Sequence, residues 1–239
     1  MNLLFKAISS AFHPKRCVSC GRITDGDYLC DYCQEMLEYA DPLKRCIKCG
    51  MLKKNCVCRY RVFRFNGCIA PFFKKDPAQR IMYSFKFRRK YRAAEFLAMQ
   101  MAFCVKNEYR SIKFDGVCFV PMHLSRKRKR GFNQSEVLAE KIAQILSLPL
   151  LNPLSCVKSA RSQHKIKDYK KRFENVKGIY KANDTAAGKT LLLVDDIMTT
   201  GATLDECSGS LLRAGADAVY CVTALRTEKK DKKNLKDGK

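Results

Sequence analysis

The segment 191–203, with the sequence LLLVDDIMTTGAT, constrains the fold of this chain more than any other stretch. Its four leading apolar residues predict a buried strand of a parallel sheet, because such strands are covered on both faces. Two aspartates stand where that strand is expected to end, and a short loop of small residues follows them. The residues after this loop predict a helix that closes at Ala214 and Gly215.

A strand, a small-residue loop and a helix N-terminus together form an anion site, since unpaired backbone N–H groups and the helix dipole point at one place. Gly201 lets the backbone approach a phosphate closely. Asp195 and Asp196 suit hydroxyl groups or a divalent cation, so a sugar phosphate fits the whole segment. The alternative is that Asp195 caps a helix or a turn and that Thr-Thr-Gly is an ordinary loop. The segment matches neither a Walker A loop nor a G-x-G-x-x-G fingerprint.

Eight of the fourteen cysteines lie in pairs in the first quarter of the chain. Two pairs with short gaps complete a zinc site of four thiolates. Such a site has no open coordination position, so two structural Zn²⁺ ions are expected. Sequential grouping is the most economical arrangement, and interleaved pairing stays an alternative. The predicted ligands are Cys17, Cys20, Cys30, Cys33, Cys46, Cys49, Cys56 and Cys58.

The net charge of +24 favours a polyanionic partner such as nucleic acid, anionic lipid or a phosphorylated small molecule; a solvated surface is the alternative. No apolar run approaches the roughly 18 residues of a membrane span, and the N-terminus lacks the pattern of a signal peptide. We therefore expect a cytoplasmic protein without membrane insertion.

The chain is predicted to have four parts. They are an amphipathic helix (1–16), a Cys-rich zinc-ribbon-like module (17–66), an α/β domain (67–227) and a basic flexible tail (228–239).

Five consecutive cations, 126–130, follow a predicted strand at 115–121. They form either an exposed nucleic-acid or localisation run, or one wall of a pyrophosphate pocket. Their position favours the pocket, because ligands of open α/β sheets collect at the carboxyl ends of strands. The polar, basic segment 158–177 predicts a functional flap or a disordered strip. His164 in that segment is either a proton carrier or a solvent-exposed side chain.

The sequence VDDIMTTGAT resembles the phosphoribosyl pyrophosphate (PRPP) signature of type I phosphoribosyltransferases. This resemblance implies a parallel sheet flanked by helices, with the 5-phosphate on the loop and the ribose hydroxyls on the aspartates. The implied PRPP-binding residues are Asp195, Asp196, Thr199, Thr200, Gly201, Ala202 and Thr203.

Three features in this order make the chain resemble the competence protein F (ComF/ComFC-like) family. They are the N-terminal Cys pairs, the segment VPMHLSRKRKRGFNQSEVLA, and KRFENVKGIY ahead of VDDIMTTGATL. The resemblance extends from Cys17 to Thr227. It implies a pyrophosphate side formed by Arg130, Gly131, Asn133 and Gln134, and a closing flap that contains Gln163, Arg172 and Asn175.

If the site is catalytic, the expected reaction displaces pyrophosphate from C1 of the ribose through a transition state that is cation-like at the ring. Mg²⁺ bound with PRPP, together with Arg128, Arg130 and flap cations, would neutralise the leaving group. Asp195 or Asp196 would stabilise the ring cation or assist the nucleophile. Cys17 belongs to a predicted metal site, so glutamine-dependent amidotransfer is not expected.

No set of residues in the sequence predicts the acceptor. Three functions fit the patterns: a phosphoribosyl (glycosyl) transferase that uses PRPP, an accessory protein for DNA uptake or recombination, and a PRPP-sensing adaptor. The second of these would bind single-stranded DNA or partner proteins. The three are not exclusive, because a fold does not determine a function.

Overall fold

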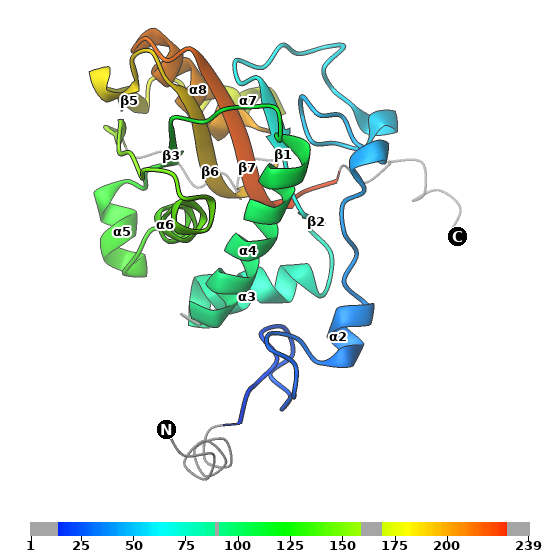
Figure 1. The fold of residues 1–239 in the computed structure, drawn as a ribbon. Coiled ribbons are helices and arrows are strands. Elements are labelled where there is room, and N and C mark those ends of the chain that lie inside the picture. The colour runs from blue at the N-terminus through cyan, green and yellow to red at the C-terminus, as the bar shows by residue number, and fades with distance from the viewer. Residues whose placement is uncertain (1–13, 89–90, 159–168, 229–239) are drawn as a thin grey trace.

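The computed structural model describes residues 14–88, 91–158 and 169–228 (Figure 1). Most of the predicted N-terminal helix, the predicted tail from 229 onward, and Gln163 and His164 of the predicted flap lie outside the described residues.

A parallel sheet lies at the centre of the fold, as predicted (Figure 1). Its strands follow the order β1-β7-β6-β3, β2 also pairs with β7, and every pairing is parallel. These strands are β1 (Gly67–Ile69), β2 (Phe72–Phe73), β3 (Gly116–Phe119), β6 (Thr190–Met198) and β7 (Ala218–Arg226). A separate antiparallel pair consists of β4 (Leu154–Cys156) and β5 (Tyr180–Ala182).

The strand β6 is longer than the sequence pattern predicts. It was expected to end at the aspartates, but it continues to Met198 because Ile197 and Met198 pair with Leu225 and Arg226 of β7. Both aspartates therefore lie inside a paired strand, which holds their backbone in place.

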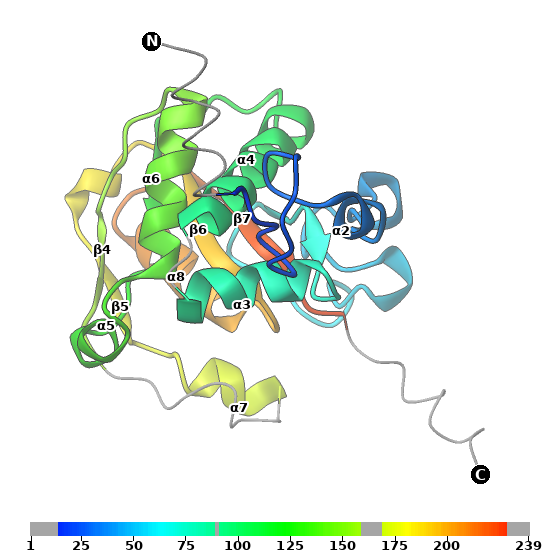
Figure 2. The same cartoon turned by 90° about the horizontal axis from the view of Figure 1, so that it is seen from below.

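Helices cover both faces of the sheet, and the strand residues alternate between them. Leu192 and Val194 contact the core under the first face, whereas Leu191 and Leu193 belong to the core under the second. The first face is covered by α3 (Ala78–Arg88), α4 (Tyr91–Glu108) and α6 (Gln134–Leu146), which Figure 2 shows in front of β6 and β7. The second face is covered by α8 (Ala202–Arg213). The shorter helical segments are α2 (Asp31–Glu35), η1 (Pro42–Lys44), η2 (Lys53–Asn55), α5 (Leu124–Arg130), α7 (Tyr169–Glu174) and η4 (Asp184–Ala186).

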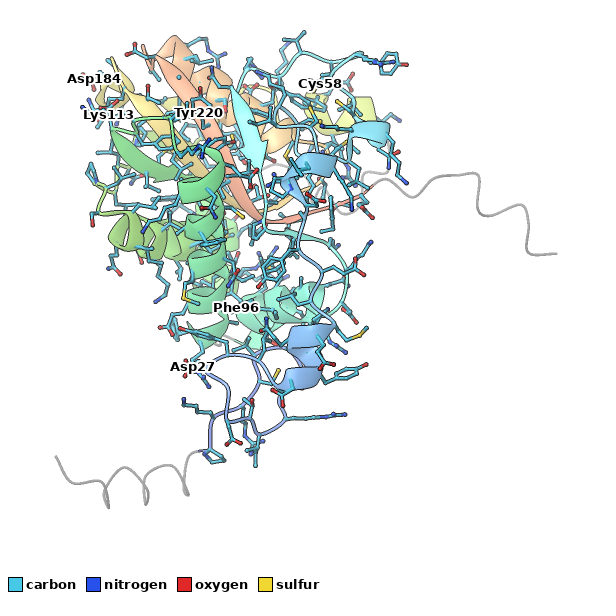
Figure 3. The ribbon with its side chains drawn as sticks, turned by 45° about the vertical axis from the view of Figure 1, so that its right-hand side comes forward. Asp27, Cys58, Phe96, Lys113, Asp184 and Tyr220 are labelled. Atoms are coloured by element: carbon cyan, nitrogen blue, oxygen red, sulfur yellow. The ribbon has the colours of Figure 1, made fainter. Side chains whose placement is uncertain are left out.

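The two Cys-rich segments belong to different cores on opposite sides of the sheet, and the first segment packs against α3 and α4. Cys17 and Cys33 belong to the core that contains α3 and α4, and Cys49 belongs to the core that contains α8. In Figure 3, Asp27 of the first segment lies near Phe96 of α4, and Cys58 of the second lies at the far end of the molecule. Each segment therefore completes a different half of the hydrophobic core.

Among the described helices, none is both long enough and apolar enough to cross a lipid bilayer.

Candidate functional site

A cavity of about 1010 Å³ opens at the carboxyl ends of β3, β6 and β7. This is the edge at which open parallel sheets bind their ligands. The two aspartates of β6 form its floor. Its walls come from segments that are far apart in the chain, between Met51 and Glu228. The residues that line it include Met51, Val57, Lys86, Phe87, Arg126, Lys129, Arg130, Asn133, Gln134, Ser135, Arg172, Asp195, Asp196, Thr199, Thr200, Thr203 and Arg226.

The loop between β6 and α8, residues 199–201, opens onto the cavity. Thr199, Thr200 and Thr203 line the main cavity, and Gly201 and Ala202 line a small adjoining space of about 30 Å³. The helix begins at Ala202, so its first turn and the positive end of its dipole face this loop, and the Ala202 N–H donates to the Thr200 hydroxyl at 3.4 Å.

Gly201 is required by both conformation and space. Its φ of 85° is left-handed, and an added Cβ would lie 2.7 Å from the Met198 Cε and 3.0 Å from the Phe63 Cε1. The loop therefore rests directly on the Phe63 ring, which belongs to the segment that leaves the second Cys cluster.

The two aspartates have different environments. The Asp195 carboxylate accepts hydrogen bonds from the Ser135 hydroxyl and the Asp196 N–H, both at 2.8 Å. Burial raises the pKa of Asp195 to about 7, and the neighbouring Asp196 charge adds to this effect, while Ser135 and Lys86 oppose it. The Asp196 carboxylate forms an ion pair with the Lys86 ammonium at 2.5 Å. Asp195 therefore titrates near neutral pH beside an ion-paired Asp196.

Lys86 and Ser135 are not among the site residues that the sequence patterns predict. Lys86 follows the buried Met82 by four positions on α3, which places a lysine beside the apolar stripe of that helix. A lysine at that position could therefore have been recognised from the sequence as a candidate site residue. Ser135 gives no comparable signal, because only the packing of α6 against β6 brings its hydroxyl to Asp195.

The basic run forms the short helix α5, and helical spacing selects the cations that face the cavity. Arg126, Lys129 and Arg130 line it, whereas Arg128 is exposed and is not among the lining residues. Gly131 ends the helix with a φ of 88° and is not among the lining residues either. The structure therefore brings Arg130 to the site and leaves Arg128 and Gly131 at its margin.

Asn133 and Gln134 line the cavity and also hold its wall together. The Asn133 amide donates to the Val120 carbonyl at 3.0 Å, and its oxygen accepts from the Ser135 N–H at 3.2 Å. Gln134 Oε1 accepts a hydrogen bond from Arg130 at 2.9 Å. These bonds attach the start of α6 to the end of β3 and to α5.

Two of the predicted flap residues are described. Arg172 of α7 lines the cavity, and Asn175, just after that helix, is not among the lining residues.

The buried Arg226 at the end of β7 donates to the carbonyls of Met198, at 3.0 Å, and Thr199, at 2.5 Å. Arg226 also lines the cavity and, like Lys86 and Ser135, is not among the predicted site residues, although an arginine at the end of an apolar strand is a signal in the sequence.

The eight cysteines form two sequential clusters, the first of residues 17, 20, 30 and 33 and the second of residues 46, 49, 56 and 58. In each cluster the four sulfur atoms lie within 4.8 Å of one another. The Sγ–Sγ distances are 3.7 Å for Cys20–Cys30, 3.9 Å for Cys46–Cys58 and 3.8 Å for Cys49–Cys56. A tetrahedron with Zn–S bonds of about 2.3 Å has edges of about 3.8 Å, so each cluster can hold one structural zinc ion.

Several known proteins are similar to this chain in sequence. Residues 132–239 match the phosphoribosyl transferase domain family. Competence protein F of Haemophilus influenzae is 26% identical over 150 residues, which cover 60% of this chain and 66% of that protein. The DNA utilization protein YhgH of Salmonella typhi is 30% identical over 155 residues, which cover 63% of this chain and 68% of that protein. Competence protein ComFC of Bacillus subtilis is 33% identical over 109 residues, 45% of this chain and 43% of that protein.

Solved structures also resemble this chain. A glutamine PRPP amidotransferase from B. subtilis has a TM-score of 0.38 and 20% identity, covering 54% of this chain and 25% of that one. A purine phosphoribosyltransferase from Pyrococcus horikoshii has a TM-score of 0.36 and 19% identity, covering 56% of this chain and 85% of that one.

The parallel sheet, the acidic pair and the loop at the start of α8 define a domain of the phosphoribosyltransferase type. The chain belongs to the competence protein F family.

Proposed function

We propose that the cavity binds PRPP together with Mg²⁺ and that the protein transfers the phosphoribosyl group to an acceptor. One observation carries this proposal: the Asp195 and Asp196 carboxylates, the threonine loop and the cations of α5 all line one cavity. A ligand with a phosphate, ribose hydroxyls and a pyrophosphate has a partner for each of these groups.

In this arrangement the loop at residues 199–203 holds the 5-phosphate through backbone N–H groups and threonine hydroxyls. The aspartates accept hydrogen bonds from the ribose hydroxyls. Arg126, Lys129 and Arg130 hold the pyrophosphate on the opposite wall, and Arg172 lies on the same cavity. These cations stabilise the negative charge that develops as the pyrophosphate leaves.

The acidic pair also suits a divalent cation, because Mg²⁺ binds carboxylate oxygens together with substrate phosphates. When bound, Mg²⁺ supplies charge neutralisation of the leaving pyrophosphate. Lys86 now pairs with the Asp196 carboxylate, so ligand binding at this oxygen requires the ammonium to move aside. Asp195, whose pKa is about 7, can either accept or donate a proton at the ribose near neutral pH.

Calorimetric titration of PRPP with Mg²⁺ tests the proposal in the wild type and in the Asp195→Asn/Asp196→Asn variant. We expect the double substitution to weaken binding by about 100-fold or more, because hydrogen bonds to charged groups contribute about 1.5–3 kcal/mol each. Asp184→Asn, which changes an exposed carboxylate of η4, is the control. Equal binding by all three proteins, or none by the wild type, would refute the site.

Pyrophosphate release in the presence of candidate bases and amines separates transfer from sensing. Release with one acceptor class supports the transferase. Binding of PRPP without release with any acceptor would instead favour a PRPP-sensing role.

A second candidate function is the binding of single-stranded DNA, and the names of the relatives, a DNA utilization protein and competence proteins, agree with it. A specific surface feature supports it. Tyr83 and Phe87 of α3 are 53% and 60% exposed, their ring centroids lie 4.8 Å apart, and the Arg130 guanidinium lies 5.7 Å from the Phe87 ring. Exposed rings beside cations are the usual platform for unpaired bases.

Fluorescence anisotropy with a labelled single strand tests this candidate. Phe87→Ser should weaken binding by about 5-fold or more, because stacking of one base contributes about 1–3 kcal/mol. Phe103→Ser is a matched control, since Phe103 on α4 is 64% exposed. Affinity should also fall steeply with salt as phosphate contacts are screened. Equal effects of the two serine variants, or an affinity that does not change with salt, would reject the candidate.

A further inference from the structure

Residues 61–64 follow the second Cys cluster in the chain. Phe63 of this segment contacts Gly201 in the loop between β6 and α8. The Phe63 ring lies against Gly201, and a Cβ added to that glycine would lie 3.0 Å from the Phe63 Cε1, a contact that requires the ring to shift slightly. Phe63 is 2% exposed and stacks on Phe65 with a centroid distance of 4.8 Å. The loop that cradles the phosphate is therefore supported by a ring from the Cys-rich part of the chain.

The same segment holds the first turn of α8. The Arg64 backbone N–H donates to Asp205 Oδ1 at 2.7 Å, and the Arg64 guanidinium donates to Asp205 Oδ2 at 3.2 and 3.0 Å. Arg64 also donates to Glu206 at 2.8 Å. The side chains of Asp205 and Glu206 are only 4% and 9% exposed, whereas the Arg64 side chain is 39% exposed, so a partly exposed guanidinium holds two buried carboxylates.

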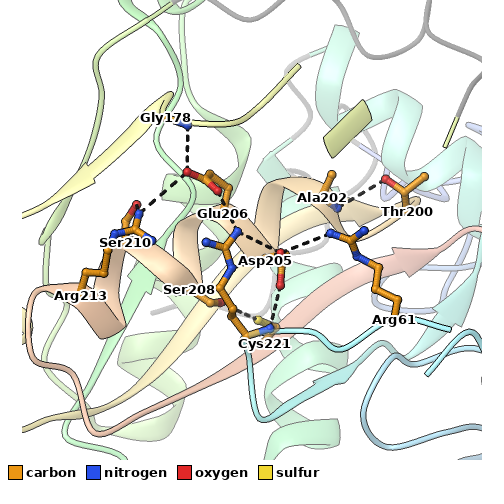
Figure 4. A network of polar contacts seen from close by, with 11 residues as sticks. Arg61, Gly178, Thr200, Ala202, Asp205, Glu206, Ser208, Ser210, Arg213 and Cys221 are labelled. Atoms are coloured by element: carbon orange, nitrogen blue, oxygen red, sulfur yellow. Dashed lines mark hydrogen bonds and ion pairs between the residues drawn. The ribbon is translucent and has the colours of Figure 1, made fainter. Parts of the chain in front are cut away.

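This network continues to the segment that follows α7. Glu206 accepts a hydrogen bond from the Gly178 N–H at 2.9 Å, and Asp205 lies 3.7 Å from the Arg61 guanidinium (Figure 4). That guanidinium lies 3.1 Å from the ring centroid of Phe173. Phe173 directly follows Arg172, which lines the cavity. Arg61 therefore connects α8 to the helix that carries a cation of the site.

The second Cys cluster precedes this segment with only two residues between Cys58 and Arg61, and it also contributes Met51 and Val57 to the cavity wall. The first Cys cluster packs in the core on the opposite face of the sheet, and no residue of 17–33 is among those lining the cavity. The two Cys clusters have the same ligand chemistry, but only the second contributes residues to the cavity wall.

We propose that Arg61, Phe63 and Arg64 are positioning residues for the phosphate loop and α7, and that the second Cys site, but not the first, organises the cavity through them. The consequence for PRPP affinity rests on the proposed function. The mechanical link between residues 61–64 and the loop does not, and it can be measured without any ligand.

Hydrogen exchange of the ligand-free protein tests that link through the amides of residues 199–203 and 173–178. Arg61→Met should increase their exchange by about 5- to 10-fold, the range expected from loss of a cation–π contact and an ion pair. Arg61→Lys should restore part of the protection, because it keeps the charge beside Asp205. Arg92→Met is the matched control: Arg92 lies 5.7 Å from the Tyr28 ring and donates to carbonyls of the first Cys segment.

Single-ligand variants of the two clusters provide the second arm. Cys58→Ser and Cys20→Ser should each reduce the zinc content from two ions per chain to one, since each removes one thiolate from a four-thiolate site. We expect faster exchange of the loop amides in Cys58→Ser only. Equal loop protection in Arg61→Met and the wild type, or equal loosening by Cys20→Ser and Cys58→Ser, would overturn the inference. If Cys58→Ser does not fold, the hydrogen exchange of Arg61→Met compared with Arg92→Met decides whether the inference stands.

Calorimetry with PRPP and Mg²⁺ on the same variants separates this inference from the proposed function. Weaker PRPP binding in Arg61→Met but not in Arg92→Met supports both. If the wild type does not bind PRPP but the exchange pattern is as expected, the proposed function fails and the positioning role stands.

Discussion

The Lys86 ammonium lies 2.5 Å from the Asp196 carboxylate, on the floor of the cavity. The side chains of both residues are mostly buried, with 12% and 18% exposed. A lysine of α3 therefore partly neutralises the acidic pair of β6 in the ligand-free protein. The Lys86 ammonium occupies the Asp196 Oδ2 position at which, in the proposed complex, a ribose hydroxyl or a divalent cation would bind.

Lys86→Met removes this internal cation and should make the acidic pair a better site for Mg²⁺ alone. Two adjacent carboxylates without a counter-charge repel each other, and a divalent cation relieves that repulsion. We expect millimolar MgCl₂ to raise the Tm of the variant more than that of the wild type in thermal unfolding. Lys141→Met, which breaks a 3.3 Å ion pair with Glu95 away from the cavity, is the control. An identical Mg²⁺ response in all three proteins would count against the site.

Asp195→Asn should stabilise the ligand-free protein while weakening ligand binding. Because the folded-state pKa of about 7 lies above the ordinary value of 3.8, the protonated carboxyl is favoured by folding, and stability is lost as pH rises from about 4 to 7. Asparagine avoids this loss and can still accept from Ser135. We expect a Tm gain of roughly 2 to 5 °C at pH 8 that shrinks toward pH 4. A gain that is independent of pH would contradict the raised pKa.

Gly201→Ala and Gly178→Ala compare two glycines with positive φ. Both alanines carry the left-handed penalty of about 1 kcal/mol. Only the Cβ at 201 meets close neighbours, the Met198 Cε at 2.7 Å and the buried Phe63 ring at 3.0 Å, whereas nothing lies within 4 Å of a Cβ at 178. Urea unfolding should therefore show an additional loss of about 1–3 kcal/mol for Gly201→Ala. Equal losses would mean that the loop adjusts freely and is not supported by Phe63.

Removal of zinc should destabilise both halves of the core. The two clusters contain eight cysteines on opposite faces of the sheet, and a structural zinc site contributes of order 10 kcal/mol to folding. We expect two zinc ions per chain by elemental analysis and a fall in Tm of about 10 °C or more after treatment with a strong chelator. Re-addition of zinc should restore the Tm. A chain purified without zinc that unfolds at the same temperature would exclude the metal sites.

The local patterns of the chain predict much of the candidate site. The apolar run before Asp195, the small residues after Asp196 and the spacing of the cysteines each reflect chemistry within a few neighbouring residues. Strand, loop and helix at 190–213 therefore lie close to their expected places, and the cysteines group sequentially. Helical spacing also explains why Arg130 reaches the cavity and Arg128 does not.

Other features depend on contacts between residues that are far apart in the chain. The extension of β6 to Met198 depends on its register with β7, and the raised pKa of Asp195 depends on burial. Lys86 and Ser135 reach the aspartates only because α3 and α6 pack against the same face of the sheet.

The sequence alone was sufficient for the parallel sheet, for the short loop of small residues after β6 and for the paired cysteines, because each depends on residues that lie close together and follow a simple period or spacing. Only the tertiary structure decided that the two sets of cysteines lie on opposite faces of the sheet and that Phe63 supports Gly201. The physical reason is that burial and packing between distant segments follow from how all the elements fill one core, and no local pattern records that arrangement.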